Sequence, residues 1–297
     1  MASVGSDILA SDFNTLRNSV VEVLGNGSGS YGYGQSLESA TVSSGQISTK
    51  NQFDAIKFDI YSSYIHQTGL TPVVTEAQTN IPIKAGAGDP INQYTQVAND
   101  IRNNRFDAVL TSVTVKGSET YSSAWGTQAE AICTLNFASA DEARYYFNCG
   151  SKIRITSSRS GGTASSQNNA WSNILNDAGS RDFGAGTDPL INFYTLTNSY
   201  TQYYFKSTST PYSANLYTLA ARCNVANNNT GTATQVEIRI RLSDDYVDLG
   251  PPSPGDVVDG NLEITVEELK AASLLKPSDT PFTITSPTFT LSAIAAT

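Results

Sequence analysis

The chain has 297 residues, of which 39% are hydrophobic and only 15% are charged, and its formal net charge is -9. This length is enough for one large domain or two smaller ones. The acidity argues against binding to the DNA backbone or to anionic membranes, because like charges repel, and no run of residues is apolar enough to span a bilayer.

The low charged fraction leaves a surface rich in hydroxyl and amide groups. Such a surface suits a protein that stays in contact with neighbours, because desolvating these groups costs less than desolvating ions. A β protein with long loops has the same composition, since turns favour these residues. Both interpretations stay open at this point.

Cysteine content and the N-terminal sequence bear on the compartment. Three cysteines do not make a disulfide framework, so we expect Cys133, Cys149 and Cys223 to be free and buried. The N-terminal residues lack a basic region followed by an apolar one, so no signal peptide is expected. These features predict a protein made in a cytoplasm.

The first 69 residues are expected to form a helical hairpin. Thr49 and Gln52 fit a capping box for its second helix, which should end by Gly69. A hairpin of this size buries its apolar stripes only against the rest of the chain or a neighbouring subunit. Region 1–69 is therefore a candidate docking or oligomerisation region. Its candidate interface residues are Leu9, Phe13, Leu16, Val20, Phe53, Ile56 and Ile60.

Region 70–250 is expected to be the main domain and rich in β structure. Within it, one short helix is expected over about 92–103, a second should follow Ser139, and a third should begin near Asn169. Hydrophobic alternation in 234–243 is typical of an antiparallel strand with one wet face. The expected strands are 108–115, 128–137, 152–158, 192–198, 201–207, 215–224 and 234–243.

Region 251–297 is expected to hold a proline-rich linker and a small C-terminal β unit. Three prolines within 248–255 mark the boundary, because proline disfavours both helix and central strand. Strands are expected at 262–266, 282–286 and 288–294, with a short helix after a Thr265/Glu268 capping box. The predicted fold is therefore α+β: an N-terminal helical hairpin, then an antiparallel, sandwich-like β domain with short inserted helices.

The residues that could carry chemistry are few. His66 is the single histidine, so Ser-His-Asp or Cys-His catalysis would have to use it, and its helical position beside aromatics favours a packing role. We expect no catalytic residues, no cofactor and no zinc site. A group of acidic residues could hold Ca²⁺ or, as we favour, form a solvated turn. These residues are Asp244, Asp245, Asp248, Asp256 and Asp259.

Tyrosine is frequent, with 15 residues, and several lie close together in the sequence. Tyrosine suits protein interfaces and sugar-binding surfaces, and it also packs well in sheets. All three interpretations stay open. The candidate residues for contact with a glycan or partner are Tyr200, Tyr203, Tyr204 and Tyr212.

Six segments together resemble the virion structural proteins of contractile-tailed phages, especially those that infect cyanobacteria. They are 29–35, 66–69, 103–106, 137–150, 152–162 and 240–245. The resemblance covers most of residues 6–245, and its motifs are moderately specific as a set but weak singly. It does not extend beyond Pro254.

The resemblance implies a homo-oligomeric virion component without enzymatic activity, in the tail, baseplate, neck, collar or fibre region. Its implied partners are other virion proteins and copies of itself, with no nucleic acid and no membrane insertion. The implied location is the virion, after synthesis in the host cytoplasm. The alternative is a receptor-binding module that recognises a host-surface glycan.

Overall fold

The computed structural model describes residues 9–46, 48–77, 90–246, 257–273 and 282–297. The chain forms two compact units. The helical unit comprises 1–111, 144–151 and 270–285, and the β unit comprises the remaining residues. This division differs from the three consecutive regions expected, because two later segments return to the N-terminal unit. The expected proline-rich boundary lies outside the described residues.

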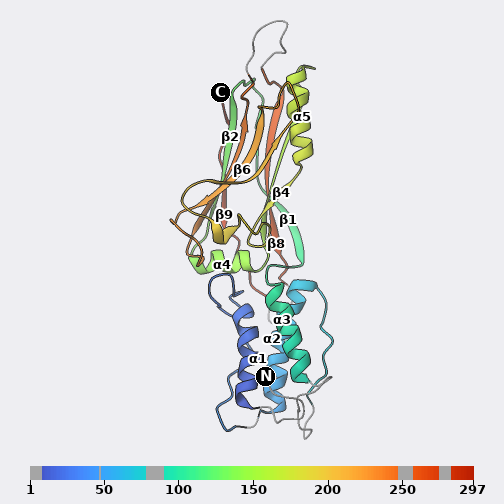
Figure 1. The fold of residues 1–297 in the computed structure, drawn as a ribbon, viewed down its shortest axis with the longest axis vertical. Helices are drawn as coiled ribbons and strands as arrows, with labels where there is room; N and C mark the ends of the chain where they lie inside the picture. The colour runs from blue at the N-terminus through green and yellow to red at the C-terminus, as the bar shows by residue number, and fades with distance from the viewer. Residues whose placement is uncertain (1–8, 47, 78–89, 247–256, 274–281) are drawn as a thin grey trace. The chain divides into compact units, whose positions relative to one another are not determined.

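Three helices lie side by side in the helical unit (Figure 1). They are α1 (Ala10–Leu24), α2 (Lys50–Thr68) and α3 (Pro90–Asn103). The Thr49 side chain accepts a hydrogen bond from the backbone N–H of Gln52, and Gly69 ends α2 in the left-handed conformation with φ 72°. The predicted capping box and helix end are confirmed.

The expected hairpin is completed by α3, which packs against both α1 and α2. The rings of Phe13 and Phe53 meet edge to face at 5.3 Å, and Tyr94 of α3 lies 6.4 Å from Phe53. The two apolar stripes therefore find their partners within the chain, which is one of the two possibilities that the sequence left open.

The β unit contains two antiparallel sheets (Figure 1). The smaller has the order β1 (Leu110–Tyr121), β8 (Asn261–Ala271), β3 (Lys152–Ser160) and β4 (Arg181–Phe183). The larger has the order β10 (Ala295–Ala296), β2 (Gln128–Asn136), β7 (Gln235–Ser243), β6 (Leu216–Cys223) and β5 (Thr201–Ser207), and β9 (Thr288–Leu291) also pairs with β2.

The two sheets face each other, as a sandwich requires. The hydroxyls of Ser157 on β3 and Tyr217 on β6 are 3.1 Å apart, and the rings of Phe183 on β4 and Tyr203 on β5 are 5.4 Å apart. On β7 every second residue from Val236 is buried. The predicted α+β class with an antiparallel, sandwich-like β part is confirmed.

The two short helices expected after Ser139 and near Asn169 are present. Helix α4 (Ala140–Asn148) begins after Ser139, whose hydroxyl accepts from the N–H of Glu142. Helix α5 (Ser166–Ala178) begins three residues earlier than expected, because Ser165 caps it. Helix α5 packs against β3 and β5, one strand from each sheet.

Several expected elements are wrong. Residues 192–198 form no strand but contain the short 3-10 helix η1 (Phe193–Thr195), because the Asn192 side chain accepts from the N–H of Tyr194 and favours a turn. The expected helix after Thr265 and Glu268 is instead the continuation of β8, which pairs with β3 along its length.

The expected strand 282–286 is also wrong as a sheet element. Phe282 and Ile284 are buried, but the backbone of Thr283 bonds to a side chain: its N–H donates to Gln35 Oε1 at 2.9 Å, and its carbonyl accepts from Gln35 Nε2 at 2.7 Å. The expected strand 288–294 is present only over Thr288–Leu291 as β9, and β10 lies beyond its end. Directly after β9, the Ser292 hydroxyl accepts from the N–H of Ile132.

Candidate functional site

His66 is a packing residue. It is 1% exposed, its Nε2 donates to the carbonyl of Cys149 at 2.9 Å, and its ring stacks on Phe282. Burial lowers the pKa of His66 to about 4, because the charged imidazolium cannot be solvated there. A neutral, enclosed imidazole of this kind is suited to fixing the core.

The three cysteines are free and buried, as predicted. Burial raises the pKa of Cys133 to about 12 and raises the pKa of Cys149 as well. Thiols with raised pKa values are poor nucleophiles and poor metal ligands. Among the described residues, no three His, Cys, Asp or Glu side chains gather as a metal ion would require.

Two of the acidic residues proposed for Ca²⁺ are already engaged by hydrogen-bond donors. Asp244 is buried, and its carboxylate accepts from the Trp171 indole at 3.1 Å and from the Gln167 amide. Oxygens that accept from N–H groups are less able to coordinate a cation. Asp248 and Asp256 lie outside the described residues.

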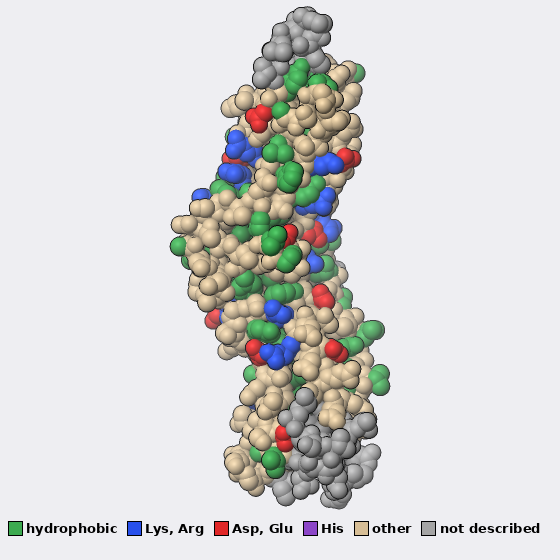
Figure 2. All heavy atoms as spheres, viewed as in Figure 1, with side chains coloured by type: hydrophobic (Ala, Val, Ile, Leu, Met, Phe, Trp, Pro, Cys, Tyr) green, Lys and Arg blue, Asp and Glu red, His purple; other side chains and the backbone are tan. Residues whose placement is uncertain are grey.

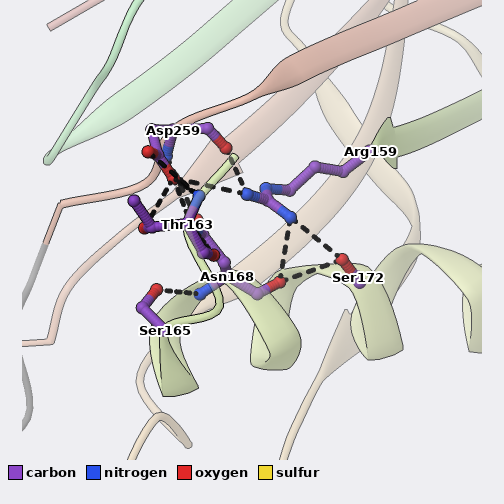
Figure 3. A network of polar contacts seen from close by, with 6 residues as sticks. All are labelled: Arg159, Thr163, Ser165, Asn168, Ser172 and Asp259. Atoms are coloured by element: carbon purple, nitrogen blue, oxygen red, sulfur yellow. Dashed lines mark hydrogen bonds and ion pairs between the residues drawn. The ribbon is translucent and has the colours of Figure 1, made fainter. Parts of the chain in front are cut away.

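Asp259 belongs to a network that joins two loops of the β unit (Figure 3). Its carboxylate accepts from the N–H and hydroxyl of Thr163, at 3.0 and 3.1 Å, and from the amide of Asn168. Arg159 Nη2 donates to the Asp259 carbonyl and lies 3.6 Å from its carboxylate. Because the donors and acceptors match one another, the network acts as a clasp between 159–168 and the start of β8.

The seven candidate interface residues of the N-terminal region do not lie on the surface together. Six are at most 3% exposed within the helical unit: Phe13, Leu16, Val20, Phe53, Ile56 and Ile60. Leu9 is 62% exposed, because it precedes the first turn of α1 and does not lie on the buried stripe. These six residues therefore form the core of the helical unit and leave no apolar surface exposed to a partner.

The four candidate tyrosines do not share an exposed platform. Tyr212 is buried, and the hydroxyl of Tyr203 is buried without a hydrogen-bond partner in the described part of the chain. Tyr200 and Tyr204 are half-buried. The guanidinium of Arg181 lies over the ring of Tyr204 at 4.1 Å, so one face of this ring is already occupied.

Strand β1 is a surface feature that the sequence did not single out. It lies at the end of the smaller sheet, and within the described residues β8 is its one neighbouring strand. Val113 and Val115 are 57% and 58% exposed, and Ser112 and Thr114 are exposed between them. An exposed edge strand with β-branched side chains is a template for pairing with another chain. The exposure of these valines could not be predicted from the sequence, which indicated only a strand.

Charged side chains on the larger sheet form a second feature. Glu237, Arg239 and Arg241 point away from the sandwich core, as the alternation of 234–243 predicted, and Arg222 lies beside them on β6. Elsewhere, acidic and basic side chains are interspersed over a mostly neutral surface, as the view in Figure 2 illustrates. The position of Arg222 beside them was not predicted, because it comes from another strand and the register between two strands is a long-range property.

No helix in the described ranges is both long and apolar enough to cross a membrane. The edge of β1 and the charged face of the larger sheet are thus the features of this chain that best fit contact with other molecules. Comparisons of the chain with family models, with curated proteins and with solved structures found no match.

Proposed function

We propose that this chain is a non-enzymatic structural component of a phage particle, associated with the tail, baseplate, neck or fibre attachment, and that it acts by assembling with other protein chains. The assignment to a phage particle is supported by the resemblance of six sequence segments to contractile-tailed phage proteins. The surface, low in charge and rich in hydroxyls and amides, supports lasting contact with neighbours.

The exposed edge of β1 is the observation that carries the assembly role. Proteins that remain monomeric usually protect such an edge with charges, proline or a bulge. Here the exposed stretch of β1 is Ser-Val-Thr-Val, which has no charge and no proline. A neighbouring chain that adds a strand would bond to the backbone groups on the open side of β1 and cover Val113 and Val115.

The assembly role is tested by light scattering on the purified full-length chain and on Val113→Lys/Val115→Lys. Lysines on the edge should prevent strand addition, so the wild-type oligomer should fall to a smaller mass. The matched control is Leu190→Lys/Val257→Lys, which adds the same charge at two exposed apolar residues outside β1. A monomeric wild-type protein that binds polysaccharides on a glycan array would instead favour a receptor-binding module.

The particle assignment needs its own experiment. Gold-labelled antibodies against the chain should decorate the tail or neck of particles from a virus that encodes it. Labelling of infected-cell extract but not of purified particles would contradict the proposal. Truncation of residues 1–69 is a poor probe, because the helical unit is built from three separate segments of the chain.

A further inference from the structure

The outer face of the larger sheet carries a group of five charged side chains, which we call the arginine face. They are Glu130, Arg222, Glu237, Arg239 and Arg241. Glu130 is opposite Arg241 and Arg222 is opposite Glu237 in the strand register. All five alternate with buried residues, so they share one surface.

The ion pairs of the arginine face differ in how close they are. Arg222 and Glu237 form a close pair, with Nη2 and Oε2 2.7 Å apart. Among the described residues, Arg239 and Arg241 share the one carboxylate of Glu130, at 3.9 and 4.0 Å. Their Nε atoms have no hydrogen-bond partner among the residues that the structure describes. The face therefore has one positive charge in excess, in a chain whose net charge is -9.

The outer face of the smaller sheet has the opposite excess, and we call it the glutamate face. Its charged residues are Lys152, Arg154, Asp182, Glu263 and Glu267. Arg154 binds Asp182 through two hydrogen bonds of 2.7 and 3.1 Å. Glu263 is exposed and accepts from the Ser118 hydroxyl at 3.2 Å, and Glu267 is half-exposed. Three carboxylates here face two cations.

We infer that the arginine face of one copy docks on the glutamate face of a second copy of this chain. The contact is heterologous, because two different surfaces meet, and such contacts build rings or stacks. Charge complementarity within a single sequence carries the inference, which rests on the assembly function proposed above.

Other occupants fit the arginine face less well. A stacked sugar needs a free aromatic face, but the Tyr200 ring already contacts Arg222 and Arg239, whose guanidinium carbons are 4.5 and 4.4 Å from its centre. Nucleic acid would meet the repulsion of an acidic molecule. A surface of the same chain supplies carboxylates that arginine binds well.

The inference is tested by exchanging the charges of the two faces. One variant is Arg239→Glu/Arg241→Glu and the other is Glu263→Lys/Glu267→Lys. In each variant alone, the two docking faces carry charge of the same sign and repel each other. Self-association measured by analytical ultracentrifugation should therefore weaken by about 100-fold. When the two variants are mixed in equal amounts, every contact between them joins opposite charges, and the wild-type mass should return as an alternating assembly.

Controls separate this inference from the proposed function. Lys50→Glu/Arg102→Glu reverses two cations of similar exposure in the helical unit and should leave the mass unchanged, with circular dichroism confirming folding of all variants. The wild type could form an oligomer that the face variants also form, or one that their mixture does not restore. Either result would contradict the docking of these two faces but not the proposed assembly function. If the wild type is monomeric at every concentration, the docking inference fails, whereas the proposed function then depends on contacts with other virion proteins, which the antibody labelling of particles tests.

Discussion

The imidazole of His66 stacks on the ring of Phe282, with the ring centres 4.1 Å apart and the planes 7° from parallel. His66 belongs to α2, whereas Phe282 comes from the C-terminal segment that returns to the helical unit. Phe282 is 1% exposed and also contacts Tyr33 at 5.7 Å. A charge on this imidazole would therefore be enclosed by aromatic carbon rather than by water.

Stability should fall as His66 becomes protonated. The pKa of His66 is about 4 in the folded chain and about 6.5 in an unfolded one, so the folded state binds fewer protons. The stability that comes from keeping His66 neutral is fully present above pH 6.5 and is lost as the pH falls toward 4. The loss in the free energy of unfolding is about 3 kcal/mol in total. The free energy of urea unfolding should show this slope, and His66→Phe should flatten it. Equal slopes for both proteins would disprove the role of His66.

Lys116 and Glu268 form an ion pair in the β unit whose removal should be costly. Lys116 Nζ lies 2.7 Å from Glu268 Oε2, and the Glu268 side chain is 3% exposed. Lys116→Met should destabilise the protein by about 3 kcal/mol, because it leaves a buried carboxylate without its cation. Thermal or urea unfolding measures the change.

A matched control uses an exposed pair. Lys206 lies 3.0 Å from Asp177, whose side chain is 62% exposed, so Lys206→Met should cost below about 1 kcal/mol. The double variant Lys116→Met/Glu268→Met should recover much of the loss, since it removes the buried charge together with its partner. If both single variants cost the same, burial of Glu268 is not the cause.

Local signals in the sequence predicted local structure well. The Thr49 and Gln52 capping box, the glycine that ends α2 and the alternation along β7 all depend on residues within a few positions of one another. Strand β8 shows where such signals fail. Thr265 and Glu268 also fit a capping box, but pairing with β3, more than a hundred residues earlier, keeps the segment extended.

The candidate interface residues failed for a similar reason. A hydrophobic stripe shows that a helix face is buried, but it does not show against which partner. Phe13 and Phe53 pack in a unit completed by α3, so a rule based on two helices could not separate core from interface. The edge of β1 and the arginine face depend on strand order and register, which are long-range properties.

The clasp at Asp259 should hold the loop before α5. Hydrogen bonds from Asn168 and Thr163 lower the pKa of the Asp259 carboxyl, so its contribution is present above the pKa of an unfolded aspartate and is lost in acid. Asp259→Ala should speed amide hydrogen exchange in 161–165 at neutral pH. Asp245→Ala, at an exposed carboxylate, is the control and should leave this exchange unchanged. Equal protection in both variants would contradict the clasp.

Gln35 acts as a strand neighbour for Thr283, because its one side chain bonds both the N–H and the carbonyl of that residue. Gln35 is buried, so Gln35→Ala should leave these two backbone groups without partners and cost about 2 kcal/mol. The amides of 282–285 should then exchange faster, as mass spectrometry after deuterium labelling would show.

Gln46→Ala is the matched control, because the Gln46 side chain is exposed and, within the described residues, accepts a hydrogen bond from its near neighbour Ser43 at 3.3 Å. It should change neither stability nor exchange in 282–285. Because Phe282 carries the stack on His66, loosening of this segment should also raise the pKa of His66 toward 6.5. Gln35→Ala should therefore shift the His66 titration followed by NMR, and an unshifted titration would show that the stack does not depend on Gln35.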